Sequence, residues 1–269
     1  MLLLYLNLRD KVALVTGASK GIGKAVAAAL AEEGCSVAIS ARGEATLREA
    51  AEEIGAGGRA VHAIPADVTR AEDAKRIVEE TAARFGTIHI LVNNAGGIGS
   101  FSSFESLSDD DWWNVLNLNV LSTVRVTRAV LPYMQKQKWG RIINMGSESG
   151  IQPDPSMPHY NASKAAVINL TKSLSKAYAK DGILVNTVSP AFIRTPLVSE
   201  MLAERAKAKG TTVAQAEADF LRENRPNIVL GRAGTSEETA AVVVFLASEA
   251  ASFVTGSNYR VDGGSVASV

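Results

Sequence analysis

The sequence has few residues of the kinds that hold metals, form disulfides or bind polyanions. It contains one cysteine, Cys35, and three histidines among 269 residues. One cysteine can form neither an internal disulfide nor a multi-cysteine metal site, so we expect no metal and a reducing, cytoplasmic environment. Lysine plus arginine and aspartate plus glutamate number 28 each. This balance gives no indication of a nucleic-acid-binding surface.

Long apolar runs are also missing. No run approaches the roughly 20 residues that cross a bilayer, so we expect a soluble protein without a membrane partner. Residues 1–6 are apolar but lack the basic n-region and the small-residue cleavage site of a signal peptide. We interpret residues 1–9 as an N-terminal extension. The chain is long enough to bury the core of one large α/β domain, and a single domain over 1–269 is predicted.

Strand-like apolar runs alternate with helical patterns along the chain. Residues 11–16 are a short apolar run, typical of a strand buried on both faces of a parallel sheet. The other predicted strands are 37–41, 60–66, 88–93, 141–145, 183–188 and 258–261, and the predicted helices are 24–33, 44–54, 70–85, 109–135, 159–180 and 237–247. This order predicts a doubly wound parallel α/β sheet of about seven strands with helices on both faces. Ligands bind such sheets beyond the carboxyl ends of the strands.

A glycine-rich turn follows the first predicted strand directly. It reads Gly17-Ala18-Ser19-Lys20-Gly21-Ile22-Gly23 and leads into a helix. Backbone N–H groups at a helix start, a positive dipole end and the absence of Cβ atoms together suit a pyrophosphate. The alternative is a tight turn that serves packing only, and the spacing differs from the commoner Gly-x-Gly-x-x-Gly.

A tyrosine and a lysine lie four residues apart in the predicted helix 159–180. Tyr160 and Lys164 therefore share one helix face, and an ammonium in that place is expected to lower the pKa of the phenol. Ser147 comes just after the predicted strand 141–145, and Ser149 follows two residues later. His159 is a weaker acid/base candidate, because its side chain projects about 100° around the helix from Tyr160.

In combination these residues resemble the short-chain dehydrogenase/reductase family, over nearly the whole chain from Lys11 to Gly264. The family motif Thr-Gly-x-x-x-Gly-x-Gly matches residues 16–23, Asn-Asn-Ala-Gly matches 93–96, and Tyr-x-x-x-Lys matches 160–164. Ser147 stands at the usual interval before Tyr160. One departure is Pro190-Ala191 in place of Pro-Gly. The overall pattern is most similar to 3-oxoacyl-acyl-carrier-protein reductases.

The resemblance implies a Rossmann-type fold and hydride transfer between nicotinamide C4 and a carbonyl or secondary alcohol. The implied catalytic residues are Asn119, Ser147, Tyr160 and Lys164. Tyr160 would donate the proton, and Ser147, for which Ser149 competes, would hold the substrate oxygen. Lys164 would also bind the nicotinamide ribose, and Asn119, for which Asn117 competes, would hold a water. The predicted cofactor-binding residues are Gly17, Ser19, Lys20, Gly21, Ile22, Gly23, Arg42, Asp67, Val68, Asn94, Ala95, Gly96, Tyr160, Lys164, Pro190, Ile193 and Thr195.

The end of the second predicted strand indicates which nicotinamide cofactor is used. Enzymes that prefer NAD usually place a carboxylate there to bind the free 2′-hydroxyl, and Ala41 cannot do so. Arg42 follows, and Lys20 lies in the glycine turn. Two cations suit a 2′-phosphate, so NADPH is predicted over NADH.

The substrate is the least determined part of the prediction. Residues 196–230 are interpreted as a substrate lid containing two short helices, and we expect a small-molecule ketone. Alternatives are a 3-oxoacyl-acyl-carrier-protein reductase, a dehydrogenase of a secondary alcohol or sugar, a non-catalytic NADP-binding sensor, and a Rossmann-type nucleotide module without activity. The resemblance also implies a homotetramer that pairs helices 109–135 and 159–180 and packs residues 261–264.

Overall fold

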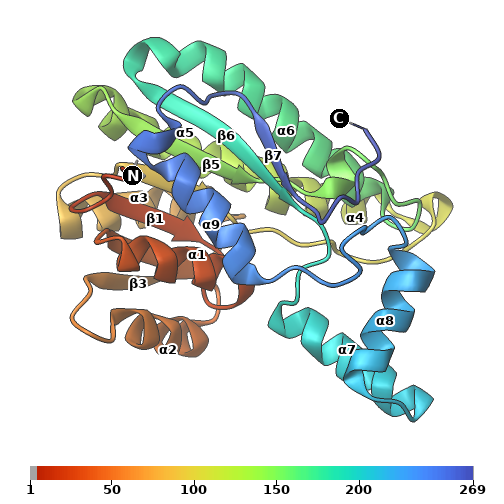
Figure 1. Ribbon diagram of the computed structural model, residues 1–269. Helices are drawn as coiled ribbons and strands as arrows, with labels where there is room; N and C mark the ends of the chain where they lie inside the picture. The colour runs from red at the N-terminus through yellow and green to blue at the C-terminus, as the bar shows by residue number, and fades with distance from the viewer. Residues whose placement is uncertain (1–4, 269) are drawn as a thin grey trace.

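A parallel seven-stranded sheet forms the centre of the protein, in a computed structural model that describes residues 5–268 (Figure 1). The strand order is β3-β2-β1-β4-β5-β6-β7, and every pairing between these strands is parallel. The strands are β1 Val12–Thr16, β2 Ser36–Ala41, β3 Val61–Pro65, β4 Ile90–Asn93, β5 Gly140–Met145, β6 Ile183–Pro190 and β7 Asn258–Val261. The predicted doubly wound sheet is confirmed. Residues 1–4 of the expected N-terminal extension lie outside the described residues.

Helices cover both faces of the sheet. They are α1 Gly21–Glu32, α2 Glu44–Gly55, α3 Ala71–Phe85, α4 Asp109–Leu116, α5 Ser122–Gln137, α6 Pro158–Tyr178, α7 Pro196–Lys209, α8 Val213–Asn224 and α9 Ser236–Ala247. Helices α1, α2 and α9 bury apolar side chains in one core cluster, and α3, α5 and α6 pack in a second cluster on the opposite face. The strands are apolar on both sides because each face contributes to one of these cores.

The helix expected over 109–135 is interrupted. Between α4 and α5 the backbone forms a π-helical segment, Asn117–Leu121. Asn119 lies in this segment, and its side-chain amide forms hydrogen bonds with the loop after β4 and with α6. A π segment holds one extra residue per turn and so changes the direction in which a side chain points. The helical periodicity of the sequence did not reveal this break.

The two short helices expected within 196–230 are α7 and α8. Thr195 caps α7 by accepting a hydrogen bond from the Val198 N–H at 3.4 Å, and Thr212 caps α8 through Gln215 N–H at 3.2 Å. Both helices stand apart from the sheet, beyond its carboxyl edge (Figure 1). The single domain and the role of 196–230 as a substrate lid stay predictions.

Within residues 5–268, no helix combines the length and apolar character needed to span a membrane.

Candidate active site

The glycine turn is packed too closely for any side chain at two of its positions. Gly17 has a φ of 66°, and a Cβ there would lie 2.8 Å from Ala95 Cα; one on Gly23 would lie 2.4 Å from the Gly17 carbonyl oxygen. Helix α1 begins at Gly21, with neither a side-chain cap nor an acidic residue in its first turn. Its first N–H groups are therefore available to an anion, and this cradle fits the pyrophosphate of a dinucleotide.

The Asn-Asn-Ala-Gly motif, residues 93–96, holds the glycine turn in place by hydrogen bonds. Asn94 Nδ2 donates to the carbonyl oxygens of Thr16 and Gly17, both at 2.9 Å. The Thr16 hydroxyl accepts the N–H groups of Asn94 and Ala95, both at 3.1 Å. The predicted cofactor residue Asn94 thus has its amide engaged by the protein, where it fixes the shape of the cradle.

A cavity of about 230 Å³ opens beside the turn. It brings together seven of the predicted cofactor residues, Gly17, Ser19, Arg42, Asp67, Val68, Ala95 and Gly96. Lys20 is exposed and is not among the lining residues. The sequence prediction missed Ser40, Gly43, Ala66 and Leu118, which also line it. The sequence did offer a sign that Ser40 belongs to the site, because it is a hydroxyl residue near the end of a buried strand. Its Oγ has no hydrogen-bond partner among the described residues.

Three of the predicted catalytic side chains converge at the carboxyl end of β5. Ser147 caps a short 3₁₀ turn, Glu148–Gly150, by accepting the Ser149 N–H at 3.1 Å. Its side chain lies near enough to the phenol of Tyr160 to lower the pKa of that phenol. Tyr160 lies in the first turn of α6. Lys164 follows one turn later, and its Nζ is 5.7 Å from the centroid of the Tyr160 ring. The strand and the helix together place two hydroxyls and an ammonium around one point.

Burial controls the protonation of this group. It lowers the pKa of Lys164 to about 8. It also raises the pKa of Tyr160; the hydrogen bond from Ser147 opposes this rise, and the carboxylate of Glu148 adds to it. The rise is opposite to the expected effect of Lys164. The ammonium donates instead to the Met145 carbonyl oxygen at 2.8 Å, and desolvation of the phenolate prevails.

Asn119 connects the loop after β4 to the catalytic helix. Its Oδ1 accepts the Gly97 N–H at 2.9 Å, and its Nδ2 donates to the Gly97 carbonyl at 3.0 Å and to Ser163 Oγ at 2.9 Å. The side chain is 1 % exposed. Its competitor Asn117 accepts a hydrogen bond from Arg125 at 2.7 Å. The amide of Asn119 therefore holds α6 in place, while its predicted water-binding role stays a prediction.

The segment after β6 lies beside the glycine turn. A Cβ on Gly21 would be 3.2 Å from Thr195 Cγ2, so the predicted residues of the two segments are neighbours. Pro190 ends β6 and is paired with Val261, and Ile193 is buried. Ala191, which replaces the family's glycine, is not among the residues with positive φ, so an alanine is accommodated there without strain.

His159 does not join the catalytic group. Its ring is fully buried and packs edge-on against Trp112, with 6.1 Å between centroids. Ser149, the competitor of Ser147, is also buried and contributes its backbone N–H to Ser147.

Comparison with known proteins agrees with this site. The short chain dehydrogenase family matches residues 11–206, so the chain belongs to this family. It is therefore an oxidoreductase that acts on carbonyl or alcohol groups with a nicotinamide cofactor.

Three similar proteins illustrate the range of the family. The 3-oxoacyl-[acyl-carrier-protein] reductase FabG of Thermotoga maritima is 38% identical over 261 residues, covering 97% of this chain and 100% of that protein. L-Sorbose reductase from Gluconobacter frateurii, solved with NADPH and L-sorbose, is 35% identical with a TM-score of 0.92, covering 97% of this chain and 98% of that one. An actinorhodin polyketide ketoreductase solved with NADPH is 32% identical with a TM-score of 0.86, covering 94% and 96%.

Proposed function

We propose that this protein is an NADPH-dependent reductase of a ketone on a small, uncharged molecule. The observation that carries the proposal is the convergence of Ser147, Tyr160 and Lys164 within reach of a glycine cradle for a dinucleotide. The alternative from another class is an NADP-binding sensor that catalyses no reaction. Such a sensor would not need these three side chains to lie together.

The cofactor, when bound, supplies the hydride. The chain supplies alignment and one proton. Ser147 Oγ already accepts the Ser149 N–H, which leaves its hydroxyl hydrogen for the substrate oxygen or for Tyr160. Because burial raises the pKa of Tyr160, the phenol stays protonated at neutral pH, the form needed to donate a proton to the developing alkoxide. Lys164 would bind the nicotinamide ribose hydroxyls.

The preference for NADPH over NADH is supported at the end of β2. Arg42 lines the cavity beside Ala41, and the end of β2 has no carboxylate to bind the free 2′-hydroxyl of NADH. A guanidinium can bind a phosphate with two parallel hydrogen bonds. Lys20 lies outside the lining residues, so we assign the preference mainly to Arg42. The ligand of the sorbose reductase structure, NADPH, is consistent with this choice.

The charges of segment 196–230 and of the loop after Ser147 favour an uncharged substrate. Segment 196–230 contains five basic side chains, Arg205, Lys207, Lys209, Arg222 and Arg225, and all except Lys207 pair with carboxylates. The loop after Ser147 carries two acidic residues, Glu148 and Asp154. An anionic ketone, or an acidic carrier protein, would therefore meet few free cations. Reduction of a 3-oxoacyl thioester stays the second candidate because of the relatives of that class.

The test is the oxidation of NADPH, followed by its near-ultraviolet absorbance, with neutral cyclic and sugar ketones, acetoacetate and a 3-oxoacyl thioester. We expect turnover with one or more neutral ketones and none above background with Tyr160→Phe. Turnover of acetoacetate or of the thioester alone would contradict the neutral-substrate proposal. Tight NADPH binding without turnover of any carbonyl, together with no oxidation of alcohols by NADP⁺, would favour the sensor.

We also expect a cytoplasmic homotetramer formed through α4–α5, α6 and the segment 261–264. Static light scattering at micromolar protein tests the assembly, and a monomer would contradict it.

A further inference from the structure

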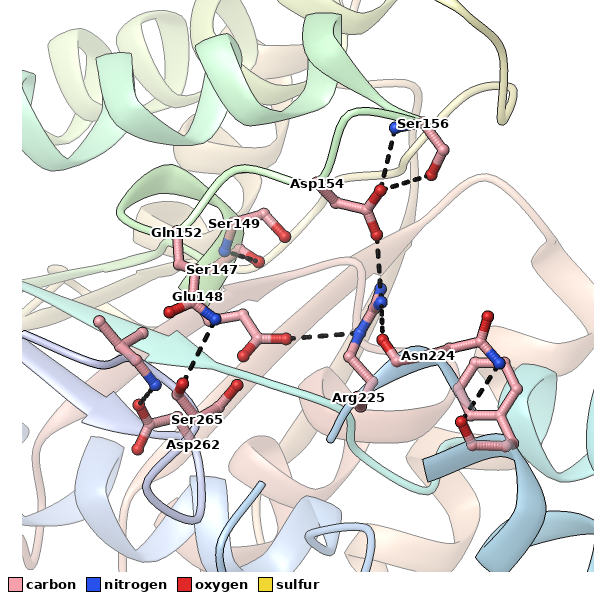
Figure 2. Close-up of polar contacts among 12 residues, drawn as sticks. Ser147, Glu148, Ser149, Gln152, Asp154, Ser156, Asn224, Arg225, Asp262 and Ser265 are labelled. Carbon is pink, nitrogen blue, oxygen red and sulfur yellow. Dashed lines mark hydrogen bonds and ion pairs between the residues drawn. The ribbon is translucent and has the colours of Figure 1, made fainter. Parts of the chain in front are cut away.

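One arginine, Arg225, joins the end of α8 to two residues of the loop 148–157, which connects Ser147 to α6 and is called the catalytic loop below (Figure 2). Arg225 follows α8, and its Nη1 donates to Asp154 Oδ2 at 3.1 Å and to the Asn224 carbonyl at 2.7 Å. Its Nε lies 3.7 Å from Glu148 Oε1. The guanidinium therefore spans two carboxylates that belong to one loop.

The two carboxylates lie at different points of the catalytic loop: Glu148 is its first residue, and Asp154 lies near its end. Glu148 directly follows Ser147 in the 3₁₀ turn. Asp154 Oδ1 accepts the N–H of Ser156 at 2.9 Å, and its carbonyl accepts Asn161 Nδ2 at 2.7 Å, inside the helix that carries Tyr160. Arg225 thus contacts one residue next to Ser147 and another bonded to the start of the tyrosine helix.

The body of α8 is attached to the segment after β6. Glu217 pairs with Arg194 and accepts the Ala233 N–H at 3.1 Å. Phe220 stacks on Phe192 with 4.8 Å between ring centroids. Since Phe192 and Arg194 flank the predicted cofactor residue Ile193, α8 extends from the cofactor segment to the catalytic loop.

The bridge is partly shielded from solvent. The side chains of Glu148, Arg225 and Asp154 are 9%, 22% and 23% exposed. Removal of the guanidinium would leave two partly buried carboxylates without their shared cation. The Arg222–Asp219 pair of the same helix offers a contrast, because its arginine is 68% exposed and its partner lies three residues away on α8. Such a surface pair contributes little.

We propose that Arg225 is a positioning residue, which fixes α8 against the catalytic loop and so keeps Ser147 aligned with Tyr160. This inference rests on the proposed reductase function. Without the bridge, Glu148 is free to move, and the turn that orients the Ser147 hydroxyl moves with it. Misalignment of this hydroxyl lowers the rate of the chemical step and leaves the hydrogen bonds between Asn94 and the glycine cradle intact.

The experiment compares Arg225→Gln with the matched control Arg222→Gln. Arg225→Gln is expected to lower kcat by about tenfold to a hundredfold, because small displacements of reacting groups have effects of this size. The Kd for NADPH, titrated by fluorescence, is expected to stay within about twofold of wild type, since the polar contacts of Arg225 are with Asp154, Asn224 and Glu148 and not with the glycine turn. Arg222→Gln should leave both unchanged. A kcat equal to wild type in Arg225→Gln would overturn the proposal.

Three further variants separate positioning from a general loss of stability. Asp154→Asn breaks one arm of the bridge, and its kcat should also fall. When the single variant Glu148→Gln and the double variant Arg225→Gln/Glu148→Gln are compared with Arg225→Gln, the two effects on kcat should not add, because both changes break the same contact. Additive effects, or losses of kcat that only parallel the fall in melting temperature across the set, would contradict positioning.

Hydrogen exchange provides a readout that does not need activity. Arg225→Gln should accelerate exchange in 148–154 and 213–224, and Arg222→Gln should not. If the wild type reduces no ketone, the proposed function fails, and unchanged exchange in Arg225→Gln separately overturns the bridge.

Discussion

Gly23→Ala is the most direct test of the glycine cradle. The added Cβ would lie 2.4 Å from the Gly17 carbonyl oxygen and 2.4 Å from Asn94 Nδ2, distances at which the backbone has to shift. The two hydrogen bonds from Asn94 to the turn, each 2.9 Å, would lengthen or break. Overpacking a tight site costs about 1–3 kcal/mol and a lost hydrogen bond about 1 kcal/mol, so we expect a loss of about 2–4 kcal/mol in the free energy of unfolding.

Two measurements follow the change. At about 2–4 °C per kcal/mol for a chain of this size, the melting temperature should fall by about 5–15 °C. The affinity for NADPH should fall by at least about tenfold, because the displaced N–H groups no longer converge on the pyrophosphate. Gly55→Ala is the matched control, because its Cβ would meet nothing closer than Val61 Cγ2 at 3.9 Å.

Gly23→Ala would refute the close-packing argument if it unfolded at the same urea concentration as Gly55→Ala and bound NADPH like wild type, since a small rearrangement of α1 would then have accommodated the methyl group. The close approach of the turn to Asn94 would then have no role in cofactor binding.

Two other predictions concern charge. Arg42→Asp should lower the ratio of kcat/KM for NADPH to that for NADH by about tenfold to a hundredfold, since a hydrogen bond to a charged group contributes about 1.5–3 kcal/mol; an unaltered ratio would show that Arg42 does not bind the 2′-phosphate. Burial lowers the pKa of Lys164 from 10.5 to about 8, so between these values the unfolded chain binds more protons than the native protein. The contribution of Lys164 to the free energy of unfolding should therefore rise with pH across this window. The free energy of unfolding, measured with urea at pH 8 and at pH 10, should therefore change less favourably with rising pH in Lys164→Met than in wild type. Equal changes in the two proteins would contradict the lowered pKa of Lys164.

Much of the site was predictable because its residues follow strand ends in a fixed order. Gly17, Asp67 and Ser147 follow β1, β3 and β5, and parallel strands bring these positions to one edge of the sheet. Tyr160 and Lys164 needed only helical periodicity. In each case a local pattern and a simple topology determine the place of the side chain.

Other features depend on packing between distant segments and leave no local pattern. The rise in the pKa of Tyr160 results from burial under surrounding segments, which no spacing of residues reveals. The bridge from Arg225 to Glu148 and Asp154 joins two segments whose contact depends on the direction in which α8 leaves the sheet. The exclusion of Lys20 from the cavity lining likewise depends on the course of the turn, since the sequence gives only its proximity to the glycines.

The π segment Asn117–Leu121 makes the helix that contains it sensitive to length. One surplus residue is accommodated in this wide turn, between α4 and α5. Deletion of a single residue there would restore regular α-helical pairing and take Asn119 out of the wide turn from which its amide reaches Gly97 and Ser163. In this helix the loss of one residue is therefore a more severe change than most substitutions, because the wide turn is itself part of the active-site design.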